Sequence, residues 1–125
     1  MRNKMKKFLQ ILKIELGDLG EELQFLGELH KSREKSGEIT TYVFRENMNL
    51  IQNEISGLQS VIKSVDNLVS SQYKSFEEMV EDLDRKIQAK IKESNYADAV
   101  YELVKRKIDK VHSYITAETW FILSA

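Results

Sequence analysis

Apolar residues recur along most of this chain in alternating steps of three and four, the spacing that places them on one side of an α-helix. We call each such run an apolar seam. The first seam comprises Met5, Leu9, Leu12, Leu16, Leu19, Leu23 and Leu26, and the second comprises Phe44, Met48, Ile51, Ile55, Leu58, Ile62, Val65 and Val69. A third apolar stripe runs from Ala97 to Ile122. Heptad seams predict helices that pack along one another. We therefore expect an all-α fold, an elongated antiparallel helical bundle or coiled coil of three long helices.

The expected ends of these helices follow from a few capping residues. Gly37 suits a left-handed cap after a first helix that ends near Lys35. Asn95 is a candidate N-cap for the last helix. Between these points the apolar steps keep their phase from about residue 40 to 93, and the chain has no proline and no glycine after residue 57. We therefore favour one long middle helix, because nothing resets its phase.

The alternative is a break in the middle helix near residues 70–75. Ser75 and Glu78 have the spacing of a capping box, in which a serine caps the first turn and a glutamate three residues later reaches back. A helix that begins there would give a bundle of four helices.

Composition narrows the classes of function. The 125 residues suffice for one domain, residues 1–125, and their net charge of −1 creates no overall field that would attract nucleic acid or an anionic membrane. The absence of cysteine excludes disulfides and thiolate metal ligands. Lys13, Glu15 and Asp18 interrupt the apolar N-terminal residues before they reach a membrane-spanning length. We expect a cytoplasmic protein without a membrane span.

The first helix has a second apolar face. Ile11, Ile14, Phe25 and Leu29 fall on the side away from the leucine seam. A helix covered on one side only shows one stripe, so this helix is expected to be covered on two. A second copy of the chain, in a closed two-fold homodimer, would supply that cover. The alternative is that the last helix of the same chain covers this face.

Gly20 and Gly27 also mark the first helix, where each glycine costs up to about 1 kcal/mol relative to alanine. Their heptad spacing suggests a close approach of a neighbouring helix, whereas glycine at an exposed position or at a bend is the simpler explanation. Near the other end of the chain, Trp120 and Phe121 begin a run of four large apolar residues that cannot all share one helix face. They predict either a docking point for a partner or packing against the end of the bundle.

Few residues suit catalysis or metal binding. The two histidines, His30 and His112, lack the paired Glu-x-x-His pattern of di-iron bundles, so we predict no metal and no cofactor. Arg106 lies six residues before His112, a spacing similar to the arginine-to-histidine motif of the HEPN family of all-α ribonucleases and toxins. That resemblance implies RNA cleavage by this pair, although Lys107 stands where the family usually has Asn, Asp or His.

Basic residues form two clusters that a hairpin near Asn95 would bring together. They are Arg85, Lys86, Lys90 and Lys92 in the first cluster, and Lys105, Arg106, Lys107 and Lys110 in the second. The clusters suit either a phosphate-binding surface or cross-helix ion pairs with nearby carboxylates, and we favour the ion pairs. The sequence thus favours a non-enzymatic helical interaction or scaffold protein that binds a second copy of itself and another protein. A ribonuclease and a nucleic-acid-binding bundle are the alternatives.

Overall fold

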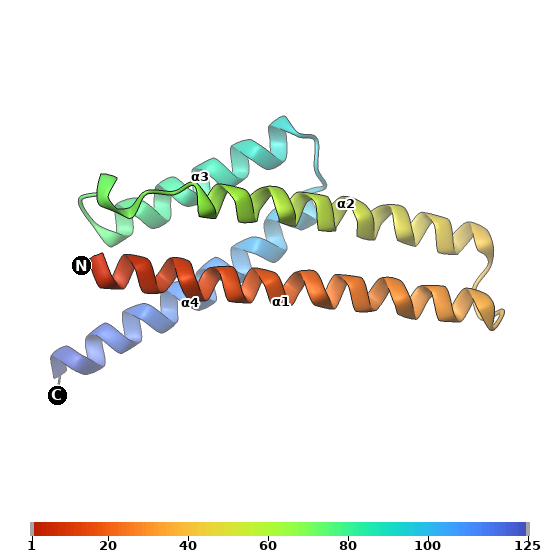
Figure 1. Ribbon diagram of the computed structural model, residues 1–125, viewed down its shortest axis with the longest axis horizontal. Coiled ribbons are helices and arrows are strands. Elements are labelled where there is room, and N and C mark those ends of the chain that lie inside the picture. Colours follow the sequence, from red (N-terminus) through yellow and green to blue (C-terminus); the bar gives the residue numbers. More distant parts are fainter. Residues whose placement is uncertain (1, 125) are drawn as a thin grey trace.

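A computed structural model describes residues 2–124 of the chain, and the side chains of residues 3–118. The chain forms four helices, α1 (Arg2–Lys35), α2 (Thr41–Asp66), α3 (Phe76–Glu93) and α4 (Asp98–Ser124), with a 3₁₀ turn, η1 (Ser70–Gln72), between α2 and α3 (Figure 1). Successive helices run in opposite directions. The expected all-α bundle is confirmed, in its four-helix form.

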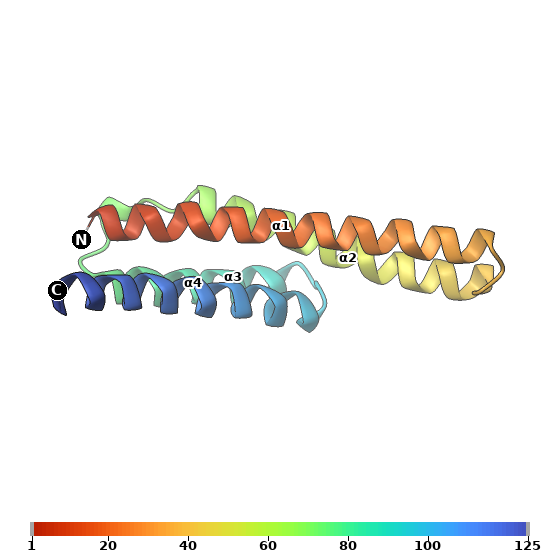
Figure 2. The same cartoon turned by 90° about the horizontal axis from the view of Figure 1, so that it is seen from below.

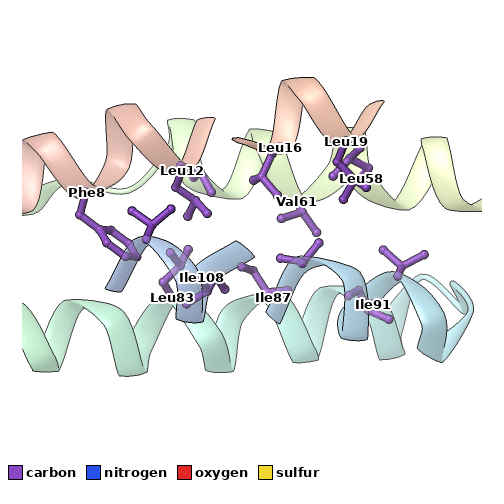
Figure 3. Packing of buried hydrophobic residues seen from close by; sticks show 14 of the residues in the cluster. Phe8, Leu12, Leu16, Leu19, Leu58, Val61, Leu83, Ile87, Ile91 and Ile108 are labelled. Atoms are coloured by element: carbon purple, nitrogen blue, oxygen red, sulfur yellow. The ribbon is translucent and has the colours of Figure 1, made fainter. Parts of the chain in front are cut away.

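The helices form two layers. Figure 2 shows α1 and α2 in one layer, with α3 and α4 in the other. Apolar side chains from both layers meet between them (Figure 3), where Phe8, Leu12, Leu16, Val61, Leu83, Ile87 and Ile108 have no exposed surface. The apolar seams therefore form a core between two layers rather than a simple pairwise coiled coil.

α1 ends where its glycine predicts. Gly37 has a φ of 80°, a left-handed conformation that glycine adopts without a steric penalty. Its N–H donates to the carbonyl of Glu34 at 3.1 Å, and the N–H of Glu38 donates to the carbonyl of Arg33 at 2.9 Å. These two bonds make a Schellman motif, which satisfies carbonyls that the helix end would leave unpaired.

The expectation of one long middle helix is wrong. α2 stops at Asp66, and α3 begins at Phe76 after its N-cap, Ser75. The Ser75 hydroxyl accepts from the N–H of Glu78 at 3.1 Å, while the Glu78 carboxylate accepts from the N–H of Lys74 at 3.1 Å. The apolar phase persists through the break because each helix sets its own phase against the shared core.

The expected role of Asn95 is also wrong. Asn95 has a φ of 58° and follows the end of α3 rather than capping the start of α4. Its N–H donates to the carbonyl of Lys92 at 3.3 Å, and the N–H of Tyr96 donates to the carbonyl of Ile91 at 3.0 Å. α3 thus ends in a second Schellman motif, with asparagine where α1 has glycine.

The molecule divides into two regions. α3 and α4 cover only the first part of α1 and the last part of α2, and the connected ends of α1 and α2 extend beyond them (Figure 2). We call residues 24–50 the projecting hairpin, and the rest of the described chain the body. No hydrophobic side chain of the projecting hairpin is buried. Within the described chain, no helix is long and apolar enough to cross a membrane.

Candidate interaction surfaces

The outer face of α1, the side away from its buried leucines, is the first candidate surface. It carries Ile11, Ile14, Phe25 and Leu29, of which Ile14 is 63% exposed, Phe25 72% and Leu29 36%, while Ile11 packs partly against the core. α4 does not cover this face. It packs beside a different side of α1, where Lys107 and Lys110 pair with Glu15. The alternative of cover by the last helix of the same chain is therefore wrong for Ile14 and Phe25.

Gly20 and Gly27 lie elsewhere, against α2 of the same chain. A Cβ atom on Gly20 would lie 3.4 Å from Leu58 Cδ2, and one on Gly27 would lie 3.4 Å from Met48 Cε. The two glycines allow α1 and α2 to approach closely, so they are part of the intrachain packing and not of the outer face of α1. Trp120 and Phe121 belong to α4, but they lie outside the part of the chain whose side chains are described.

A second candidate surface lies where α4 meets the base of the projecting hairpin. Its floor is apolar and comes from two helices. α1 supplies Leu19, Leu23 and Leu26, and α4 supplies Ala99 and Leu103. The rim is formed by Glu22, Glu54 of α2, Glu102 and Arg106. We call this depression the junction groove.

Three carboxylates lie on the rim of the junction groove. Among the described residues, Glu22, Glu54 and Glu102 have neither an ion pair nor a side-chain hydrogen bond. Burial without a partner raises the pKa of Glu54 above its usual value. The groove therefore presents negative charge that no cation on the described chain neutralises directly.

Several basic residues of the two predicted clusters pair with carboxylates of the body. Arg85 and Lys86 contact Asp82, and Lys105 contacts Asp84 and Asp109. A hydrogen bond from the Tyr73 hydroxyl, followed by the ammonium group of Lys86, lowers the pKa of Asp82. The Lys105–Asp84 pair and the pairs of Lys107 and Lys110 with Glu15 cross between helices, as the ion-pair interpretation expects. The pairs of Asp82 and Asp109 lie within one helix.

The structure does not bring Arg106 and His112 together. Arg106 lines the junction groove beside α1. His112 faces α3, where its Nε2 lies 2.9 Å from Glu77 Oε1 and its ring stacks on Phe76 with centroids 5.5 Å apart. The pair therefore lacks the shared position that a two-residue ribonuclease centre requires.

His30 is half-buried and has its own neighbour within the chain. Its Nδ1 lies 3.5 Å from Nδ2 of Asn47, across the α1–α2 pair. Among the residues that the structure describes, no three His, Asp or Glu side chains gather as a metal site would require.

Sequence reasoning missed the junction groove. Its walls come from three segments far apart along the chain, residues 19–26, Glu54 and residues 99–106, so no local pattern marks it. A partial signal was present in α2, where Val43 and Leu50 lie seven residues apart and outside the second seam. Both are exposed, with Leu50 at 60%. They lie on the same side of α2 as Gly57, which packs against Val100 of α4 further along the helix.

The fold and its surfaces define a helical bundle with a projecting, partly apolar hairpin. Comparison with known protein families, with curated proteins and with solved structures finds no match for this chain.

Proposed function

We propose that this protein is a non-enzymatic helical scaffold that self-associates through the outer face of α1. The observation that carries the proposal is the exposure of Ile14 and Phe25, at 63% and 72%, on a helix whose other side is buried from Met5 to Leu23. Large apolar side chains that share one exposed face mark protein interaction surfaces. A second copy of the chain is a natural occupant because most soluble oligomers are homo-oligomers with closed symmetry.

The spacing of the apolar residues suits a two-fold pair. In an antiparallel pairing of two α1 helices centred near residue 20, Ile14 of one copy lies level with Phe25 of the other. Ile11 lies level with Leu29 in the same way. Such a self-complementary pattern is what a two-fold interface requires, since each contact then occurs twice.

The same pairing brings like charges together at its centre. Asp18 and Glu21, both exposed, lie between the two apolar pairs of the outer face. Salt screens repulsion between exposed carboxylates. We therefore expect the dimer to become tighter as the salt concentration rises, the opposite of an interface held by ion pairs.

Sedimentation equilibrium tests the proposal directly. We expect a mass of twice 14.6 kDa at micromolar to millimolar concentration. Phe25→Glu should reduce the mass to that of one chain without loss of helical circular dichroism. The matched control is Tyr42→Glu, because Tyr42 is equally exposed, at 72%, but lies on α2. A wild-type protein that stays monomeric over this range would refute the proposal, as would equal effects of the two variants.

A further inference from the structure

The junction groove has the length and shape to receive a helix. Its floor follows α1 from Leu19 to Leu26, about two helical turns or 10 Å. Gly20 lies against Leu58 and Gly27 against Met48, so Leu26 is level with Leu50 across the α1–α2 pair. Val43 lies two turns further along α2 on the same side as Leu50. The apolar floor thus continues onto the projecting hairpin for about 20 Å in total, the length of a helix of about 14 residues.

The negative charge around this floor favours a positively charged occupant. Residues 15–28 of α1 contain five carboxylates and no lysine or arginine. At the groove itself Glu22, Glu54 and Glu102 face one cation, Arg106. Even when Arg106 offsets one carboxylate, two remain in excess, so a cationic partner gains electrostatic attraction and a phosphate backbone is repelled.

A second copy of this chain does not fit the groove. The outer face of its α1 is flanked by Asp18, Glu21 and Glu28, so it would bring further negative charge to an acidic rim. Apolar side chains at the spacing of one helix face, with lysine or arginine on both flanks, would match the floor and the rim together.

We infer that the junction groove binds a cationic amphipathic helix of a partner protein. This inference rests on the proposed scaffold function, because it names the chemistry of the partner that the scaffold would hold. The groove and the outer face of α1 lie on different sides of α1. Binding at the groove therefore does not require the protein to be a dimer.

The probe for the test is an 18-residue peptide with a leucine stripe on one helix face and lysines on its flanks. Two control peptides accompany it. The first has the same composition in a scrambled order, which destroys the stripe, and the second has glutamate in place of every lysine. Binding to the full chain is measured by fluorescence anisotropy. Amide chemical shifts then locate the contact. We expect the striped cationic peptide alone to bind, to perturb Leu26, Ala99 and Leu103, and to bind more weakly as salt rises.

Variants of the chain separate groove binding from general attraction to an acidic protein. Glu54→Lys combined with Glu102→Lys should weaken binding by about tenfold or more, because two attractive charges become repulsive. The matched control is Glu28→Lys, which changes an exposed carboxylate of α1 outside the groove, and it should change affinity less than about twofold. Circular dichroism checks that each variant is folded.

The failures of the two proposals are distinguishable. Phe25→Glu should abolish the dimer and leave peptide affinity unchanged. The groove double variant should weaken peptide binding and leave the dimer unchanged. Equal binding of the striped and scrambled peptides would overturn the groove inference, and so would equal affinity of the double variant and the wild type. Shifts confined to the outer face of α1 would overturn it too.

Discussion

The body and the projecting hairpin use the same apolar seams with different results. In the body, α3 and α4 supply a second layer, and most seam residues of α1 and α2 are buried beneath it. In the projecting hairpin no second layer exists, and six of the nine exposed large hydrophobic side chains of the described chain lie there. These are Phe25, Leu26, Leu29, Tyr42, Val43 and Leu50. Heptad spacing therefore determines which side of a helix is apolar, but it does not determine whether that side is covered.

The difference has an energetic consequence. Two isolated helices bury little surface, and helical stability in proteins comes mostly from tertiary packing. The projecting hairpin is therefore held by its continuity with the body and by whatever binds to it. Three comparisons between the two regions and one within the body test this, from the largest expected effect to the smallest.

Truncation of one leucine in each region should give the largest contrast. Leu12→Ala in the body should lower the free energy of unfolding by about 2 to 5 kcal/mol, because Leu12 is fully buried between the layers. Leu50→Ala in the projecting hairpin should change it by less than about 0.5 kcal/mol, since Leu50 is 60% exposed. Urea unfolding of both variants measures the two values. Similar losses would show that Leu50 is covered in solution.

Glycine-to-alanine substitutions should differ in sign between the regions. A Cβ on Gly57 would lie 2.9 Å from Val100 Cγ1 and 3.3 Å from Tyr96 Cγ, so Gly57→Ala should destabilise the body by about 1 to 3 kcal/mol. A Cβ on Gly27 would meet only the flexible end of Met48 at 3.4 Å. Gly27→Ala should therefore stabilise the protein by up to about 1 kcal/mol, through higher helix propensity. Thermal unfolding gives both signs, and a stabilising Gly57→Ala would contradict the close packing of α2 against α4.

The two Schellman ends offer a smaller contrast. Gly37→Ala places a Cβ at a φ of 80° and should cost about 1 to 2 kcal/mol at the tip of the projecting hairpin. Asn95→Gly at the end of α3 removes a Cβ that already occupies the left-handed region, so it should be neutral or stabilising by less than about 1 kcal/mol. Urea unfolding and amide exchange of residues 33–40 measure these effects. A neutral Gly37→Ala together with a destabilising Asn95→Gly would contradict the left-handed conformation of these two residues.

Two carboxylates should give the smallest effects, with opposite dependence on pH. Tyr73 and Lys86 lower the pKa of Asp82 below 3.8, so its stabilising contribution is present above that pH and disappears as pH falls through the lowered pKa. Burial raises the pKa of Glu54 above 4.5, so the folded state holds its proton more tightly and loses stability as pH rises from 4.5 through the raised pKa.

At neutral pH, Asp82→Asn should therefore destabilise the protein and Glu54→Gln should stabilise it. Each change should be less than about 1 kcal/mol because both groups are partly hydrated. Unfolding free energies between pH 3 and pH 7 measure the effect of each variant. A loss of stability in Glu54→Gln at neutral pH would indicate that Glu54 has a cationic neighbour in solution.

Much of the fold was predictable, and the failures share a cause. The end of α1 followed from Gly37, whose left-handed conformation is a local property of glycine. The break between α2 and α3 was visible only as the Ser75–Glu78 capping box, and the continuous apolar phase outweighed it. Asparagine is favoured both as an N-cap and as the left-handed residue after a helix. Asn95 lies after α3 and has the second role. Local signals with two structural meanings were resolved by tertiary packing.

The candidate surfaces divide in the same way. The outer face of α1 was predictable from Ile14 and Phe25, because residues of one helix share a face by periodicity alone. The junction groove was not, because it exists only where α4 parts from the α1–α2 pair.

The sequence by itself determined that the chain is helical, which side of each helix is apolar, and where the first helix ends, since these depend on bonds and spacings within a few turns. Only the tertiary structure decided that α3 and α4 stop short of the α1–α2 tip. The reason is that the length of one layer relative to another is a property of how helices stack, and no single helix encodes it. The apolar residues left beyond that edge, together with the unpaired carboxylates beside them, are the surfaces through which we propose that this protein acts.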